Sequence, residues 1–271
     1  MLRERLALPA AAVLLVVVLS AILAGIVAPE NPERQDYMHV LEPPNAAHLM
    51  GTDDLGRDVL SRVIYGSRVS VSVGLVAVGL SILIGVPLGL IGAYRRGWLD
   101  DVIMRAMDAV SGFPDLVLAL GITAALRPGL VNVMVAIGII YTPQFARLAR
   151  GQALSVREQE FVSAARLIGA SPGRLIVRHI WPNVTAPIIV QASLRVAAAI
   201  VTEASLSFLG SGVPPPTPTW GSMLRASYQY TETAPWLAIF PGAAIFLTVL
   251  ASNVFGDAVR SALDPRTRGR A

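Results

Sequence analysis

The chain has 271 residues and a net charge of +4; 54% of its residues are hydrophobic and only 15% are charged. Soluble domains carry roughly 25% charged residues, so this chain has too little polar surface to face water on all sides and is predicted to lie in a membrane. It has no cysteine, which excludes disulfides, thiolate nucleophiles and thiolate metal sites.

All 22 basic residues are arginine. The lack of lysine and the placement of the arginines each argue against one further class of function. Without lysine the chain cannot form the phosphate-binding loop whose lysine reaches the β- and γ-phosphates, so any ATP that drives it must be hydrolysed by another polypeptide. The arginines are scattered between apolar blocks instead of clustered, which argues against a nucleic-acid partner. The three histidines are far apart in sequence and predict no metal site.

Six apolar stretches are long enough to cross about 30 Å of hydrocarbon, which takes about 20 residues of helix. None alternates as a membrane strand does, so the predicted fold is an all-α membrane protein with about six spans. Charged residues edge the third stretch and lie inside the fifth. We place the spans at 6–28, 69–93, 102–126, 131–148, 184–209 and 236–255.

The first stretch has a secretory signal peptide as its alternative interpretation, because Arg3 and Arg5 precede it. Its apolar core is about 20 residues long, whereas the core of a signal peptide has about 7–15. An uncleaved first helix is therefore favoured, followed by an external segment. We accordingly divide the chain into residues 1–68 and a core of five spans at 69–271.

The distribution of arginine predicts the orientation. If the N-terminus is cytoplasmic, most of the 22 arginines fall on the cytoplasmic side, which is the bias expected of inner-membrane proteins. Both termini are then inside. Two long polar segments, 29–68 and 210–235, lie outside, and the segment 149–183 lies inside.

The second span carries a stripe of small residues at every fourth position. Such a stripe lets another helix approach closely, because packing drives helix association in lipid. We favour packing within the chain over a role in lining a pore. The stripe consists of Ala77, Ser81, Gly85, Gly89 and Ala93.

The internal segment 158–183 has the pattern of two helices joined by a sharp turn. Gly169 can end the first helix by taking a left-handed conformation, and Ser171 followed by Pro172 is typical of the start of a second. The first helix either lies on lipid headgroups or docks on a partner, and its small alanines favour docking. Four residues are spaced to share its docking face: Phe161, Ala164, Ala165 and Ile168.

The residues from Glu160 to Ala170, with Pro182 thirteen residues after Gly169, resemble the EAA loop of ABC importer permeases. Ser163 stands where the motif usually has a glutamate. In that family the loop forms a coupling helix that sits in a groove of the ATPase subunit. The resemblance therefore implies a coupling role for Glu160, Phe161, Ala164, Ala165, Ile168, Gly169 and Pro182.

Further stretches resemble the dipeptide/oligopeptide/nickel branch of this family, and its C-type permease in particular. The resemblance covers nearly the whole chain in the expected order. The matching stretches are Gly-Thr-Asp-Asp-Leu-Gly-Arg-Asp at 51–58, Glu-Ala-Ser-Leu-Ser-Phe-Leu-Gly at 203–210, Pro-Pro-Pro-Thr-Pro-Thr-Trp-Gly at 214–221, Asn-Val-Phe-Gly-Asp at 253–257 and Leu-Asp-Pro-Arg at 263–266.

This resemblance implies the type I ABC importer permease fold in a bacterial inner membrane. The implied partners are a second homologous permease, two ATPase subunits that bind ATP and magnesium, and an external solute-binding protein. The chain itself is expected to be non-catalytic and to hold no cofactor. The implied cargo is a dipeptide or oligopeptide, with nickel or another small solute as the alternative.

Arg195 and Glu203 lie inside the fifth span, where charge is costly and usually faces a bundle interior or an aqueous cavity. They are eight residues apart, about 12 Å along a helix, which is too far for a close pair. Arg195 is the better candidate for the translocation path or a contact with the second permease, whereas Glu203 has solvation at the outer end as its alternative. An ion-coupled secondary transporter would require paired charges and inverted repeats, which we do not find. A membrane scaffold is the remaining alternative.

Overall fold

The computed structural model describes residues 2–263, with the side chains of residues 6–262. Two parts of the sequence analysis lie outside the described part: the tail with Asp264, Pro265 and Arg266, and the side chains of Arg3 and Arg5. The described chain is almost entirely helical, which confirms the predicted fold class. Its helices are α1 (Leu2–Val27), α2 (Val59–Arg95), α3 (Trp98–Ser111), α4 (Asp115–Leu126), α5 (Leu130–Arg157), α6 (Glu160–Leu167), α7 (Pro172–Arg174), the π-helix η1 (Leu175–Ile180), α8 (Trp181–Phe208), α9 (Trp220–Ser227), the 3-10 helix η2 (Tyr228–Tyr230) and α10 (Trp236–Leu263).

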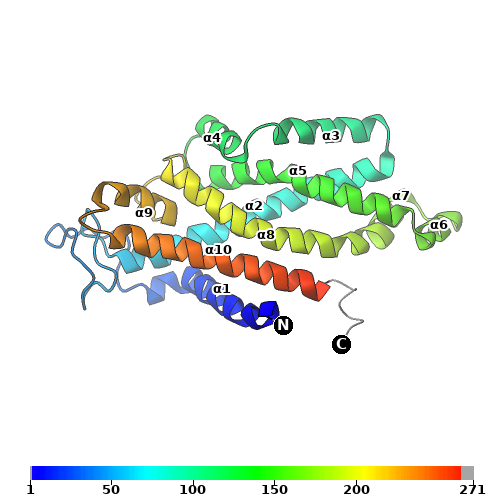
Figure 1. The fold of residues 1–271 in the computed structure, drawn as a ribbon. Helices are drawn as coiled ribbons and strands as arrows, with labels where there is room; N and C mark the ends of the chain where they lie inside the picture. The colour runs from blue at the N-terminus through cyan, green and yellow to red at the C-terminus, as the bar shows by residue number, and fades with distance from the viewer. Residues whose placement is uncertain (1, 264–271) are drawn as a thin grey trace.

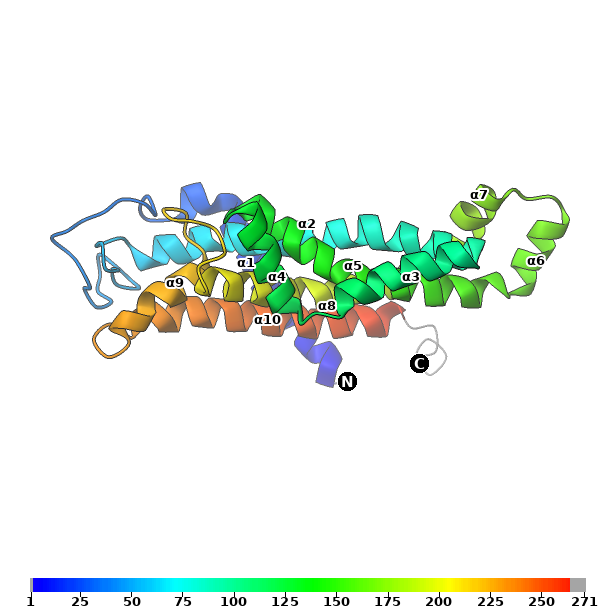
Figure 2. The ribbon, with the colours of Figure 1, turned by 90° about the horizontal axis from the view of Figure 1, so that it is seen from above.

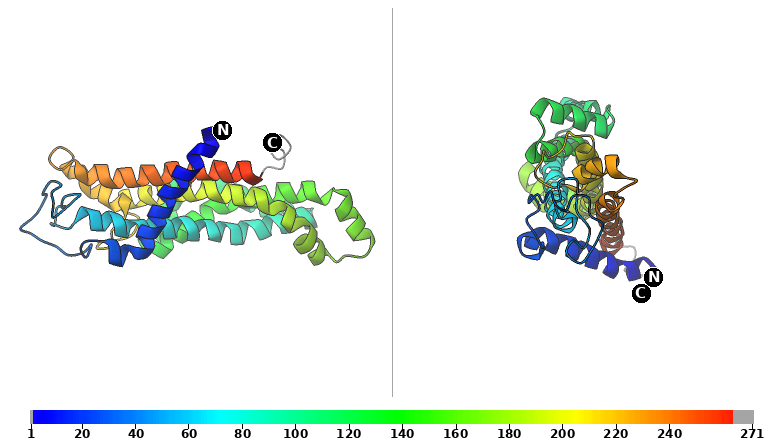
Figure 3. Two further views of the ribbon diagram at one scale, coloured as in Figure 1. Left: turned by 90° about the horizontal axis from the view of Figure 1, so that it is seen from below. Right: turned by 90° about the vertical axis from the view of Figure 1, so that its left-hand side faces the viewer.

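Four long helices, α2, α5, α8 and α10, run lengthwise beside one another and form an elongated bundle (Figure 1). Helix α1 crosses one side of this bundle obliquely, and α3 with α4 covers the opposite side (Figure 3). The segment between α1 and α2 gathers with α9 at one end. Helices α6 and α7 stand at the other end (Figure 2).

Within residues 2–263, five helical runs are long and apolar enough to cross a membrane, and a sixth is counted if α3 and α4 form one broken span. The number of predicted spans is therefore confirmed, but a single straight helix over 102–126 is wrong. Helices α3 and α4 meet at 91°. The break falls at Gly112, Phe113 and Pro114, where proline disfavours helical backbone at the residue before it and cannot donate an intrahelical hydrogen bond.

Helix α2 begins at Val59, ten residues before the predicted span. Asp58 caps its first turn, because its carboxylate accepts a hydrogen bond from the backbone N–H of Ser61 at 2.8 Å. The proposed boundary after residue 68 therefore falls inside a continuous helix. Hydropathy locates the apolar part of such a helix and misses the polar turns that extend it beyond the membrane.

The small-residue stripe of α2 faces α5, which confirms the prediction of packing within the chain. A Cβ atom at Gly85 would lie 2.5 Å from the carbonyl oxygen of Thr142. Ser81 donates a hydrogen bond from Oγ to the carbonyl oxygen of Gly138 at 3.0 Å. The two backbones thus approach closely enough for a side chain of one helix to bond the main chain of the other.

Candidate functional site

The segment between α1 and α2 is organised by buried contacts of aspartate with arginine and histidine. The Asp53 carboxylate accepts a hydrogen bond from Arg57 Nε at 2.7 Å and lies 3.4 Å from Arg62 Nε. Asp58 contacts His48 Nδ1 at 3.1 Å in addition to capping α2. Because arginine, histidine and backbone N–H groups occupy these carboxylates, the geometry supports a structural segment over a metal-binding loop.

Two tryptophans join this segment and the first turns of α2 to the later helices. Trp236, at the start of α10, donates from Nε1 to the carbonyl oxygen of Thr52 in the segment at 3.2 Å. Trp220, at the start of α9, donates from Nε1 to the carbonyl oxygen of Val63 in the second turn of α2 at 2.9 Å. The segment, the start of α2, α9 and the start of α10 therefore form one cap at this end of the bundle.

At the opposite end, the turn predicted after the first loop helix is confirmed. Gly169 has φ +84°, the left-handed conformation that favours glycine. Pro172 occupies the first turn of α7, directly after Ser171, as predicted. Helix α7 then continues through η1 into α8, so the second loop helix is an extension of a helix long and apolar enough to span a membrane.

The predicted docking face of α6 is wrong at one residue. Val162 is 0% and Ala165 5% exposed, and both pack against Leu175 of η1. Ala165 therefore holds α6 to the adjoining helix and is not available to a partner. Pattern alone could not assign the faces, because an eight-residue helix with apolar residues on several sides has no unique inner face.

The outer surface of α6 is apolar and open. Ala164 is exposed, Phe161 is half-exposed with its ring centroid 6.5 Å from that of His179, and Ile168 is 87% exposed. Leu167, which the sequence analysis did not single out, is 88% exposed. Large apolar side chains clustered at the tip of a molecule mark an interaction surface.

The base of α6 is tied to α2. Arg157, at the end of α5, donates from Nη1 to the carbonyl oxygens of Ala93 and Tyr94, both at 3.0 Å. Arg96 and Glu158 form an exposed ion pair at 2.7 Å. The start of α6 is therefore connected to α2 and α5 as well as, through Leu175 of η1, to α8.

Two of the predicted coupling residues lie at the edges of this unit. Glu160 is exposed in the first turn of α6. Pro182 is exposed in the first turn of α8, where the π-helix η1 gives way to regular helix. The structure thus gathers the predicted residues at the end of the bundle opposite the cap, with Ala165 alone turned inward among the apolar ones.

Arg195 and Glu203 do not pair, as predicted from their spacing. The Arg195 guanidinium lies over the ring of Tyr141 in α5, 5.2 Å from its centroid. Glu203 is 0% exposed, so the alternative that it is solvated at the outer end is wrong. The last turn of α8 is covered by α9, and a Cβ atom at Gly221 would overlap the carbonyl oxygen of Ala204.

Comparison with known protein families decides the identity. A family model described as "Binding-protein-dependent transport system inner membrane component" matches residues 85–269, more than half of the chain. The chain belongs to this permease family. A second model, the "N-terminal TM domain of oligopeptide transport permease C", matches residues 1–44, which agrees with an uncleaved first span.

Curated relatives resemble the permease over nearly its whole length. A "Dipeptide transport system permease protein DppC" from Alkalihalophilus pseudofirmus is 42% identical over 98% of this chain and 88% of the relative. A "Glutathione transport system permease protein GsiD" from Pectobacterium atrosepticum is 41% identical over 98% and 89%. An inward-facing structure of the MetNI methionine ABC transporter superposes with a TM-score of 0.63 at 16% identity, covering 75% of this chain and 96% of that one. The chain is therefore a permease of ABC importer fold.

Glu203 of the permease yields a stability prediction. Its Oε1 accepts a hydrogen bond from Ser207 Oγ at 2.7 Å, while its Oε2 has no partner among the described residues. An ionised carboxylate that is buried with a single hydrogen bond is costly, and glutamine keeps the acceptor without the charge. Glu203→Gln should melt at or above the wild-type temperature, whereas Glu203→Leu, which leaves Ser207 without its acceptor, should melt lower. A lower melting temperature for Glu203→Gln would show that the charge itself is needed.

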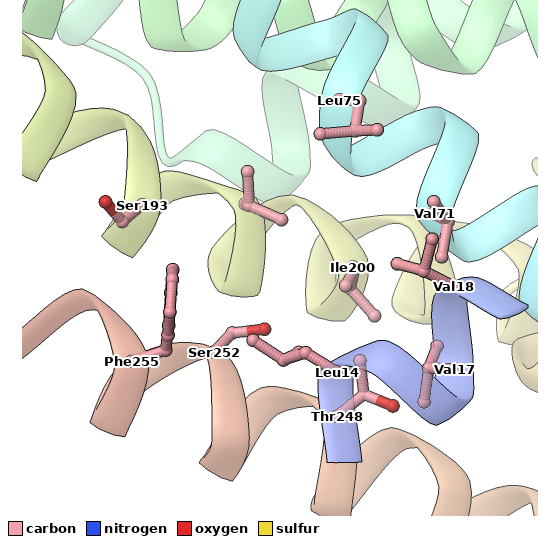
Figure 4. Close-up of a pocket in the computed structure, with 11 residues that line it drawn as sticks. Leu14, Val17, Val18, Val71, Leu75, Ser193, Ile200, Thr248, Ser252 and Phe255 are labelled. Carbon is pink, nitrogen blue, oxygen red and sulfur yellow. The ribbon is translucent and has the colours of Figure 1, made fainter. Parts of the chain in front are cut away.

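The permease also has an apolar pocket of about 280 Å³ among α1, α2, α8 and α10 (Figure 4). Aliphatic side chains such as Leu14 and Leu75 line most of it. The hydroxyls of Ser193 and Thr248 donate to carbonyl oxygens of their own helices, Ile189 and Ala244. With its hydroxyls so engaged, this pocket is poorly suited to a charged solute.

Proposed function

We propose that this permease imports peptides and forms the translocation path together with a second, homologous permease. The observation that carries the proposal is its similarity, over nearly the whole chain, to permeases named for dipeptide and glutathione transport. Glutathione is itself a peptide, so both relatives point to one chemical class. Nickel or another small solute is the alternative cargo.

Two ATPase subunits would supply the energy, with ATP and magnesium bound there. The exposed apolar side chains of α6 would form the contact with the ATPases. The contacts that connect α6 with α2, α5 and α8 would carry its movement to the spanning helices. ATP binding would draw the ATPases together and move α6 of each permease. The spanning helices would follow, so that the path opens alternately to the two sides.

An external binding protein would deliver the solute to the cap formed by residues 29–58, α9 and the adjoining loops. This places α6 and both termini in the cytoplasm, in the orientation that the arginines favour. The proline-rich loop at 214–218 and pockets lined by Arg68 and by Arg225 lie on the external side in this orientation.

The orientation is testable because the natural chain has no cysteine. Ser171 beside α6 and Thr217 in the external loop are both exposed. A single cysteine at Ser171 should react only with reagents that reach the cytoplasm, and one at Thr217 only with reagents added outside. The reverse pattern would overturn both the orientation and the coupling role of α6.

Purification in native lipids tests the assembly. Co-purification of two ATPase subunits and a second permease is the expected result. An ion-coupled transporter or a membrane scaffold would bring neither, and recovery of the chain without an ATPase from membranes that actively import peptides would contradict the proposal.

A further inference from the structure

Arg195 carries a charge that no described residue of this chain neutralises. It lies near the middle of α8, where an ionised side chain is costly. Arginine stays protonated, so the cost cannot be avoided by loss of a proton. In the part of the chain that the structure describes, no carboxylate lies within 4.0 Å of its guanidinium, which instead contacts the ring of Tyr141. A ring face orients a guanidinium but does not balance its charge.

Further polar groups lie on the neighbouring helix. The hydroxyl of Tyr141 is 3.0 Å from Oγ1 of Thr202, which is on α8 two turns beyond Arg195. Gln144 lies one turn along α5 from Tyr141, and its Oε1 is buried without a hydrogen-bond partner among the described residues. The α5–α8 pair therefore carries a cation beside Tyr141 that has no carboxylate partner among the described residues and, one turn along α5 from Tyr141, an acceptor that has no hydrogen-bond partner among them.

Asp115, at the start of α4 after the break between α3 and α4, does not supply the missing counter-charge. It is exposed and lies beyond the 4.0 Å of an ion pair with Arg195.

We propose that Arg195 binds the terminal carboxylate of the peptide as it passes through the membrane. A guanidinium and a carboxylate match in a two-pronged hydrogen-bonded pair, and Tyr141 holds the guanidinium for that contact. The unpartnered Gln144 Oε1 could accept a hydrogen bond from the N–H of a peptide bond. This inference rests on the proposed peptide import.

A site in a transport path must also release its ligand. One arginine without a second cation provides a single strong contact, which is compatible with brief binding. An acidic residue of the second permease could supply the carboxylate instead, and the experiment separates these two partners.

The test uses the complete complex in proteoliposomes, with its binding protein saturated by a dipeptide or by the same dipeptide with an amidated C-terminus. Because the binding protein is saturated in each case, the free-acid and the amidated dipeptide are delivered to the permease equally. Initial ATP-dependent uptake is measured for wild type, Arg195→Gln and Arg195→Lys. Arg147→Gln is the matched control, because Arg147 forms an exposed ion pair with Asp108 at 3.2 Å.

The wild type and Arg147→Gln should take up the acid roughly 10-fold or more faster than the amide, the scale of a lost charged hydrogen bond. In Arg195→Gln the uptake of the acid should fall until the ratio approaches one, and Arg195→Lys should restore part of the preference. An equal fall for acid and amide would assign Arg195 to a contact with the second permease and overturn the inference. Unchanged uptake in Arg195→Gln would also overturn it. Failure of the wild type to import any peptide would refute the proposed function, and this inference with it.

Discussion

Leu167→Glu should leave the permease folded and inserted but abolish its productive contact with the ATPase. Leu167 is 88% exposed at the end of α6, so the folded chain does not depend on its burial. In a complex, glutamate would place an unpaired charge in an apolar contact, at a cost of about 2–5 kcal/mol. We expect ATPase retention to weaken by roughly 30-fold or more. The measurements are subunit stoichiometry after purification and stimulation of hydrolysis by the loaded binding protein.

Two variants control this experiment. Leu167→Met keeps an apolar side chain and should behave as wild type. Ala165→Glu places a charge in the cluster with Val162 and Leu175, and it should lower the melting temperature of the permease itself. Full stoichiometry and full stimulation in Leu167→Glu would show that the outer surface of α6 is not where the ATPase docks.

Gly89→Val should prevent the permease from reaching its native packing. A Cβ atom at Gly89 would overlap the carbonyl oxygen of Ala146 and lie 3.0 Å from the backbone nitrogen of Arg150. These are backbone atoms of α5, so the two helices must separate. Overpacking of a core typically costs about 1–3 kcal/mol. Here we expect the upper end or beyond, measured as loss of monodisperse protein and a lower melting temperature.

Gly79→Val is the matched control, because Gly79 lies in the same helix and a Cβ atom there would meet nothing within 4 Å. The substitution has the same effect on helix propensity without the clash. It should melt within a few degrees of wild type. Equal destabilisation of the two variants would show that close approach of α2 to α5 is not what holds the bundle together.

The sequence predicts the membrane fold well because hydropathy and helix length are local properties. The small-residue stripe of α2 likewise predicts a close helix contact, and α5 packs against it. Gly112 and Pro114 indicate the break between α3 and α4, but the mean hydropathy of the stretch 102–126 does not reveal it. The extension of α2 to Val59 depends on a cap by Asp58 that hydropathy does not register.

The candidate site is less predictable. Gly169 and Pro172 mark the turn, but which side of α6 faces the chain depends on Leu175, which packs on it from η1. Ala165, predicted to lie on the docking face, therefore packs against the chain, whereas Leu167, to which the spacing assigns no role, is exposed. Burial of Glu203 depends on α9, which follows it across a loop, so position along α8 alone indicates a solvated end. Arg195 is correctly singled out, because charge inside a span is conspicuous in any sequence.

Uptake by the reconstituted complex tests the central proposal most directly. Proteoliposomes should contain this permease, the co-purified second permease and the ATPases, and receive labelled dipeptide with the binding protein outside. The account predicts accumulation that requires ATP inside and the binding protein outside, and that persists when ion gradients are collapsed. Accumulation driven by an ion gradient without ATP, or none with a peptide-loaded binding protein, would contradict it.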